Sequence, residues 1–284
     1  MNRRILHELL VMFTAVVVAL VPSLVRAADT DTMFRVGVVP HTSARIILEM
    51  YQPLRESLQK NLGVPVEIVT APNFNEYIRR ALDQNYDIAI TTGHQARVLE
   101  VDAGYKPLMT YKAPFRSVAI VPVESTLQGP KELAGTTVVG LGPTSLVTQW
   151  GAHWLHDAGV TDTKMRYVSA ADSEAQLVLA GDASVGFMSL ANYEYLAPEV
   201  RTRLRILAQS EPVLGRVYML NARQQGRRDA LIAALHTFAA TPVGQQYFDQ
   251  SHLEGYREVR PGEMESMDFY AQEVREALKT ISRQ

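Results

Sequence analysis

The feature that most constrains the fold of this 284-residue chain is a regular alternation of short apolar runs and amphipathic stretches, which starts at Phe34. Short apolar runs bounded by turn residues predict buried strands, whereas apolar residues at helical spacing predict helices that cover them. Residues 34–39 are predicted to form such a strand. The helix after it is expected to start at Ser43 and to stop at Gly63, with Pro53 inside it. The alternation as a whole predicts an α/β fold.

The same pattern continues along the chain. Asn73, with Glu76 three residues later, is typical of a helix start, and this second helix is expected to run to Leu82. The tail is predicted to be helical from 228 to 248 and from 267 to 281. Further strands are predicted at residues 64–69, 87–90, 117–123, 137–139, 165–168, 185–188 and 217–220.

Two of the apolar runs indicate a division into two lobes. The strands near residues 117–123 and 212–220 are predicted to carry the chain out of the first set of elements and back into it. We therefore expect residues 28–116 and 213–284 to form one lobe and residues 117–212 to form the other. A ligand cleft and a hinge are expected between the lobes.

The amino-terminal segment predicts secretion. Arg3 and Arg4 precede an apolar run at residues 9–21, and Val25 and Ala27 are small residues at the positions that a signal peptidase recognises. An uncleaved membrane anchor is the less favoured alternative, because the run is short for a membrane span. We expect cleavage after Ala27 and location in the periplasm.

Composition excludes several classes of function. The chain has no cysteine, which excludes a lipid-anchored cysteine, a disulfide and thiolate chemistry. Removal of residues 1–27, with three arginines and one glutamate, leaves 257 residues with 25 basic and 29 acidic side chains. No block of like charge is present, so nucleic acid and anionic membranes are poor candidate partners. The mature protein is expected to be a monomer.

Three turns share one local design, in which a buried strand leads through a hydroxyl-rich segment into a helix. Helix N-termini hold anions through free backbone N–H groups and the positive end of the helix dipole. Ligands of open α/β sheets bind beyond the carboxyl ends of the strands, where these turns should lie. Capping of the helices alone is the alternative role for these hydroxyls. Ser189, at the end of another strand, is either a further contact or a core residue. The candidate ligand-binding residues of the three turns are His41, Thr42, Thr91, Thr92, His94, Thr144 and Ser145.

Motifs of catalysis and cofactor binding are missing from the sequence. It has no G-x-S-x-G, H-E-x-x-H or lysine-containing P-loop motif, and the pair Gly140 and Gly142 lacks the third glycine of a dinucleotide fingerprint. His153 and His156 lie three residues apart on one predicted helix, but no third metal ligand is evident. We therefore predict a protein that is not an enzyme and that has no cofactor or metal.

Five segments, which span most of the chain after residue 27, follow one another in a specific order and spacing. They are VGVVPHTSARIILEMYQPLRESLQKNLGVPVEIVTAPNFNEYIRRALDQNYDIAI at 36–90, FRSVAIV at 115–121, KELAGTTVVG at 131–140, HDAGV at 156–160 and TPVGQQYF at 241–248. This succession resembles the phosphate/phosphonate-type substrate-binding proteins of bacterial ABC importers. The resemblance implies a two-lobed type 2 periplasmic-binding fold that closes on a small anionic ligand without catalysis, and a permease as partner.

The resemblance also implies roles for particular positions. The family places tyrosines near His41 and His94, and a Ser-Thr-Ser-Gly run where this chain has residues 144–147. Asp172 corresponds best to the carboxylate that meets the amino group of aminoalkyl phosphonates. The alternative for His41 and His94 is that one or both only cap a helix or pack. Since an unperturbed imidazole has a pKa of about 6.5, His41 and His94 are expected, as ligand contacts, to increase anion affinity as the pH falls.

Two functions remain open on the sequence alone. The preferred interpretation is a periplasmic binding protein that delivers a small oxyanion, phosphonate-like or phosphate-like, to an ABC importer. The alternative is an extracytoplasmic sensor of the same fold that presents a bound oxyanion to a membrane histidine kinase.

Overall fold

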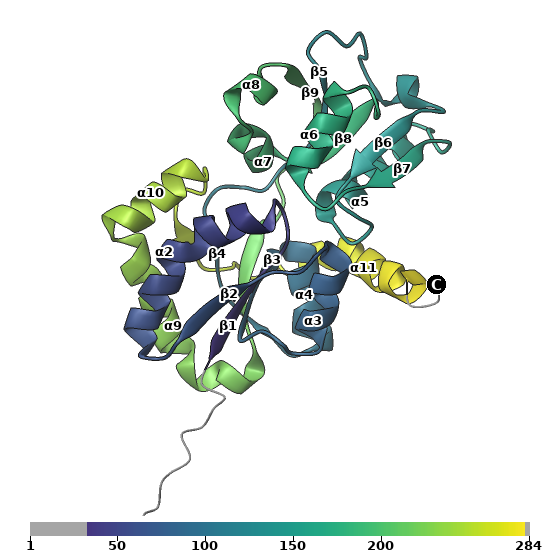
Figure 1. Ribbon diagram of the computed structural model, residues 1–284. Helices are drawn as coiled ribbons and strands as arrows, with labels where there is room; N and C mark the ends of the chain where they lie inside the picture. The colour runs from purple at the N-terminus through teal and green to yellow at the C-terminus, as the bar shows by residue number, and fades with distance from the viewer. Residues whose placement is uncertain (1–32, 282–284) are drawn as a thin grey trace, which may run out of the picture. The chain divides into compact units, whose positions relative to one another are not determined.

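The computed structural model describes residues 33–281, and the predicted signal peptide lies outside them. Two sheets organise these residues (Figure 1). The strands of the first sheet are β1 (Phe34–Val38), β2 (Val66–Val69), β3 (Ile88–Thr92), β4 (Lys106–Tyr111), β10 (Arg216–Leu220) and β11 (Tyr256–Arg257). Their order in the sheet is β11-β4-β10-β3-β1-β2, and β1 is parallel to both β2 and β3, whereas β10 is antiparallel to its neighbours.

The second sheet takes all its strands from the middle of the chain. They are β5 (Ser117–Pro122), β6 (Thr137–Gly140), β7 (Lys164–Tyr167), β8 (Val185–Ser189) and β9 (Leu204–Gln209). Their order is β7-β6-β8-β5-β9, with β6 parallel to β7 and β8, and with β5 antiparallel to β8 and β9. Parallel neighbours require helical crossovers, so both sheets are of the α/β type that the sequence predicts.

Helices cover both faces of each sheet (Figure 1). They are α2 (Ala44–Leu62), α3 (Phe74–Leu82), α4 (Gly93–Asp102), α5 (Leu146–Asp157), α6 (Ala171–Leu179), α7 (Leu190–Tyr195), α8 (Pro198–Arg201), α9 (Arg228–Ala239), α10 (Pro242–Gln250) and α11 (Asp268–Ile281). Short 3₁₀ segments lie at η2 (Pro130–Leu133), η3 (Ala222–Arg227) and η4 (Glu265–Met267). Strands covered on both faces are apolar throughout, which is why the central strands appear in the sequence as continuous apolar runs. Within residues 33–281, no helix is long and apolar enough to cross a membrane.

Local signals set the helix ends that the sequence predicts. The Ser43 hydroxyl caps α2 by accepting a hydrogen bond from the Ile46 N–H, and Gly63 ends the helix in a left-handed conformation. Asn73 caps α3 in the same way through the Glu76 N–H. These predicted boundaries are confirmed.

Strands β4 and β9 were not predicted. Pro107 in β4 has no N–H for the ladder, and the register between β4 and β10 shifts where Pro107 pairs with Met219. In a sequence, a proline inside a short apolar run argues against a strand. In the structure, the irregular pairing of β4 with β10 accommodates Pro107.

The chain crosses between the sheets twice, from β4 to β5 and from β9 to β10. The two crossovers pair with each other at Phe115 and Val213, where each N–H donates to the carbonyl oxygen of the other residue. All the strands of the second sheet lie between these two positions. The connection between the lobes is therefore a narrow two-stranded ribbon.

Five buried tyrosines form a cluster beside β10, here called the tyrosine cluster. The Tyr111 hydroxyl is its centre, at 2.8 Å from the Tyr218 hydroxyl, 2.6 Å from that of Tyr247 and 3.5 Å from that of Tyr51. Tyr256 joins through the Tyr218 hydroxyl at 2.9 Å. Burial raises the pKa of Tyr111, Tyr218, Tyr247 and Tyr256, so these phenols are neutral in the folded protein.

Because of the tyrosine cluster, we expect the folded protein to lose stability steeply in alkali. An unfolded phenol ionises at a pKa of about 10, whereas the folded pKa is higher, so stability is complete below about pH 10 and is lost as the pH rises further. In an alkaline titration, the phenolate absorbance of the tyrosine cluster should therefore appear only together with loss of circular dichroism. Tyr111→Phe should lower the free energy of unfolding by about 1–3 kcal/mol because it leaves buried hydroxyls unpaired. The exposed Tyr195→Phe is the control. Complete phenol ionisation while the dichroism is still native would contradict the prediction.

Candidate ligand-binding site

A cavity lies between the two lobes, where the strand ends of both sheets meet. Its volume is about 20 Å³. The walls include apolar residues such as Phe74, Leu141 and Val147. The polar side chains that line it are His41, Thr92, Ser145, Ser189, Asn192 and Arg216.

Two helices begin at this cavity with hydroxyl residues that do not cap them. Thr92 precedes α4 and Ser145 precedes α5, and neither side chain makes the cap hydrogen bond to its own helix. The Thr92 hydroxyl is buried and has no hydrogen-bond partner among the described residues. Ser189 differs, because its hydroxyl accepts from the Asn192 N–H and so caps α7. Thr92 and Ser145 thus leave both their hydroxyls and the first-turn N–H groups of their helices available to an anion.

The turn before α5 depends on a glycine. Gly142 has φ +120°, which side chains rarely permit, and its carbonyl accepts from the Ser145 N–H at 3.1 Å. This turn aims the N-terminus of α5 at the cavity.

Arg216 supplies the positive charge of the cavity. It is the first residue of β10, pairs across the sheet with Thr92 and is only 8% exposed. Its Nη1 lies 3.5 Å from the Tyr51 hydroxyl, a long hydrogen bond. Tyr51, Tyr111 and Tyr247 act on its charge, and among residues 33–281 no carboxylate lies within ion-pair distance of it. A buried guanidinium without a counter-ion is costly, so its position favours an anionic ligand.

Sequence analysis missed Arg216. The signal was present, because an arginine stands directly before the apolar residues 217–220. A strand that lies between two other strands, under helices on both faces, keeps such a side chain away from solvent. Only the placement of β10 between β3 and β4 reveals this.

Both histidines are buried and neutral. His41 Nδ1 lies 2.9 Å from the Val39 carbonyl oxygen, and His94 Nε2 lies 3.0 Å from the Thr144 carbonyl oxygen. Burial and then the Arg216 cation lower the pKa of His41, and burial lowers the pKa of His94 to about 3. This corrects the expectation of charged imidazoles near neutral pH, because both rings are buried. His41 lines the cavity, whereas His94 is held against the turn before α5.

Other predicted residues hold the lobes together around the cavity. Thr42 donates to the Asp172 carboxylate across the lobes at 3.3 Å, and Thr144 donates to the Asn75 side-chain oxygen at 2.8 Å. Asn192 donates to the His41 carbonyl oxygen at 2.9 Å. The hydroxyls of Thr42 and Thr144 are therefore engaged by protein groups.

Thr91 does not line the cavity. Its side chain is fully buried, and its hydroxyl donates to the Gln95 side-chain oxygen at 2.7 Å. Since alternate residues of a strand face opposite sides of the sheet, Thr91 and its neighbour Thr92 point in opposite directions.

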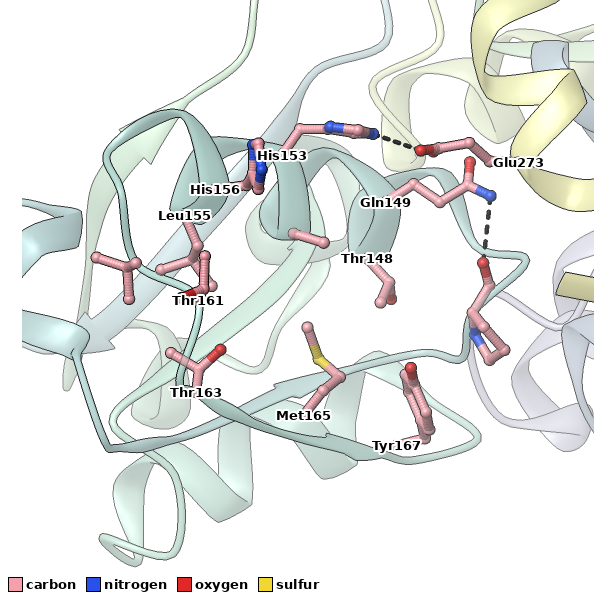
Figure 2. Close-up of a pocket in the computed structure, with 13 residues that line it drawn as sticks. Thr148, Gln149, His153, Leu155, His156, Thr161, Thr163, Met165, Tyr167 and Glu273 are labelled. Atoms are coloured by element: carbon pink, nitrogen blue, oxygen red, sulfur yellow. Dashed lines mark hydrogen bonds and ion pairs between the residues drawn. The ribbon is translucent and has the colours of Figure 1, made fainter. Parts of the chain in front are cut away.

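A larger cavity, of about 600 Å³, lies between α5 and β7 (Figure 2). Figure 2 shows Met165 and Tyr167 on the side opposite α5, with Glu273 of α11 at the rim, where its carboxylate meets His153 at 2.6 Å. Size alone does not make this the main site, because the residues that line it include no lysine or arginine. No cluster of three or more candidate metal ligands occurs within residues 33–281, which include His153 and His156.

Two α/β lobes, a two-stranded connection and a cavity at the strand ends define a class of protein. They form a two-lobed type 2 periplasmic-binding fold, with the ligand cleft between the lobes. The chain belongs to the family described as "ABC transporter, phosphonate, periplasmic substrate-binding protein", whose model matches residues 36–263. It is therefore a solute-binding protein of ABC import, and the sensor alternative is not favoured. The family works in the periplasm. No curated protein matches the sequence.

Solved structures share this fold at low sequence identity. PhnD1 from Prochlorococcus marinus in complex with methylphosphonate is 13% identical with a TM-score of 0.76, over 86% of this chain and 98% of that one. A binding protein component of an ABC phosphonate transporter from Pseudomonas aeruginosa is 14% identical with a TM-score of 0.73, over 87% and 88% of the two chains. XAC2383 from Xanthomonas citri, bound to a chloride ion, is 18% identical with a TM-score of 0.70, over 86% and 99%.

Proposed function

We propose that the protein captures a small tetrahedral oxyanion of the phosphonate or phosphate class in the cavity between the lobes and delivers it to an ABC permease. The observation that carries this proposal is Arg216, a buried cation without a carboxylate partner among the described residues. Thr92 and Ser145 add hydroxyls at two helix N-termini beside it. The phosphonate that the family description names and the methylphosphonate bound to PhnD1 are of the same chemical class.

The proposal includes a role without catalysis. The Thr92 hydroxyl makes no hydrogen bond to a base among the described residues, so nothing in this arrangement activates it as a nucleophile. The two histidines are neutral, and each gives its single N–H to a backbone carbonyl. The groups that line the cavity thus bind and orient an anion.

The proposal also includes two moving lobes in a periplasmic monomer. Residues 28–116 and 213–284 would move as one body and residues 117–212 as the other, about the ribbon at Phe115 and Val213. The hydrogen bonds of Thr42 and Thr144 across the lobes would form on closure. A signal peptide cleaved after Ala27 would place the protein in the periplasm.

A thermal-shift and calorimetry screen tests the function. The ligands are phosphate, phosphite, methylphosphonate, arsenate, sulfate and methanesulfonate, and a ligand that binds only the folded state raises the melting temperature. Thr92→Val should weaken the best oxyanion roughly ten- to a hundred-fold, because one hydrogen bond to a charged group is lost. Thr91→Val makes the same chemical change one residue away and should leave affinity unchanged, since its hydroxyl faces Gln95.

The screen has clear contrary outcomes. The proposed class is wrong if none of the six ions binds. Equal losses of affinity in the Thr91 and Thr92 variants would instead remove Thr92 from the site.

A further inference from the structure

The orientation of His41 leaves an unused hydrogen-bond acceptor in the cavity. Its Nδ1 lies 2.9 Å from the Val39 carbonyl oxygen, and because a carbonyl only accepts, Nδ1 must carry the proton. A neutral imidazole has one N–H, so Nε2 presents a lone pair. Nε2 is buried and has no partner among the described residues, and the ring is 5% exposed. An unpaired buried acceptor favours a ligand that donates a hydrogen bond to it.

The surroundings of His41 keep this acceptor neutral. Two charged groups lie near His41. Arg216 on β10 acts on the ring, and Asp172 on α6 accepts a hydrogen bond from the hydroxyl of the adjacent Thr42. Asn192 on α7 donates to the His41 backbone oxygen and leaves the ring alone. Burial and the Arg216 cation lower the pKa of His41, so Nε2 stays unprotonated through the neutral range.

The other walls of the cavity carry hydrogen-bond donors, whereas His41 presents an acceptor. Arg216, the Thr92 hydroxyl and the N-terminus of α5 are donors, which suit the unprotonated oxygens of an oxyanion. An unprotonated oxygen placed against Nε2 would set one lone pair against another. A hydroxyl on the same phosphorus would instead donate to Nε2. One buried cation also matches one negative charge better than two.

We propose that His41 selects a singly protonated tetrahedral oxyanion, by accepting at Nε2 the hydrogen bond of its acidic hydroxyl. The preferred ligands are then the monoanions of phosphite, phosphate or an alkylphosphonate. Sulfate and alkylsulfonates are poor ligands, because they carry no hydroxyl near neutral pH. This inference rests on the proposed function, that an oxyanion binds in this cavity.

Calorimetry across the second pKa of the ligand tests the inference, with phosphite and methylphosphonate as ligands and methanesulfonate as the hydroxyl-free comparison. Above that pKa the monoanion fraction falls, so the apparent Kd should rise by about tenfold per pH unit. Methanesulfonate should bind at least roughly tenfold more weakly than methylphosphonate below that pKa. His41→Gln can turn its amide N–H to the ligand, so its pH slope should flatten and its preference over methanesulfonate should shrink. His94→Gln is the matched control, because His94 does not line the cavity, and it should keep both properties.

The outcomes separate the two proposals. If no oxyanion binds at any pH, the proposed function fails. If the phosphorus oxyanions bind but their affinity is constant or rises with pH, His41 does not select a hydroxyl and only this inference is overturned. Retention of the wild-type pH slope in His41→Gln, or its loss in His94→Gln, also overturns the assignment to His41.

Discussion

Replacement of Arg216 by glutamine is expected to reduce oxyanion affinity by at least about 30-fold, because truncation of a buried charge pair costs about 2–5 kcal/mol. Without ligand, the variant should be as stable as the wild type or more stable. The reason is that Arg216 is a buried cation that forms no ion pair with a carboxylate within residues 33–281. Calorimetry and thermal melts of the same samples measure both quantities.

The control for this variant is Arg45→Gln. Arg45 is exposed and pairs with Glu49 one helical turn away, so the change in net charge is the same and the affinity should not change. A matching loss in both variants would point to the overall charge of the protein rather than to a contact. A variant of Arg216 that is destabilised without ligand and still binds normally would assign Arg216 a structural role.

Replacement of Glu174 by glutamine is expected to stabilise the protein at alkaline pH and to have little effect in acid. Glu174 on α6 is fully buried, and neither carboxylate oxygen has a hydrogen-bond partner among the described residues. Burial raises the pKa of this carboxyl well above its usual value. The contribution of this carboxyl to the stability of the folded protein is therefore complete below the pKa that it has in the unfolded chain. That contribution is lost as the pH rises through the higher pKa of the folded protein.

The size of this effect follows from the linkage of folding to proton binding, about 1.4 kcal/mol for each unit between the unfolded and the folded pKa. For a chain of this size that corresponds to about 2–4 °C in melting temperature per kcal/mol. The measured quantity is the difference in melting temperature between Glu174→Gln and the wild type, which should grow from pH 5 to pH 8. Glu124→Gln removes an exposed carboxylate, and its difference should stay nearly constant. A Glu174 difference that does not change with pH would show that the carboxyl is already ionised or otherwise satisfied.

Features that depend on neighbouring residues were predictable from the sequence. The caps at Ser43 and Asn73 and the stop at Gly63 need only side chains within one helical turn, and all three are confirmed. The family assignment also follows from the order of local segments, and the match over residues 36–263 confirms it.

Features that depend on distant pairing could not be predicted in this way. Arg216 is a buried charge only because β10 pairs with β3 and β4, which are more than a hundred residues earlier in the chain. The neutrality of His41 likewise depends on Arg216, far away in sequence. Sequence analysis located the turns that surround the cavity, but the charges inside it required the tertiary structure.

Because α4 and α5 begin without a side-chain cap, their first turns are expected to become more stable when a ligand binds. A missing N-cap hydrogen bond costs a helix typically about 1 kcal/mol, and Thr92 and Ser145 both withhold theirs. An oxyanion that accepts from the first-turn N–H groups would serve both helices as the cap that the chain does not provide. Binding would then complete secondary structure in two lobes at once. Amide hydrogen exchange in the first turns of α4 and α5 would then become slower when the solute binds.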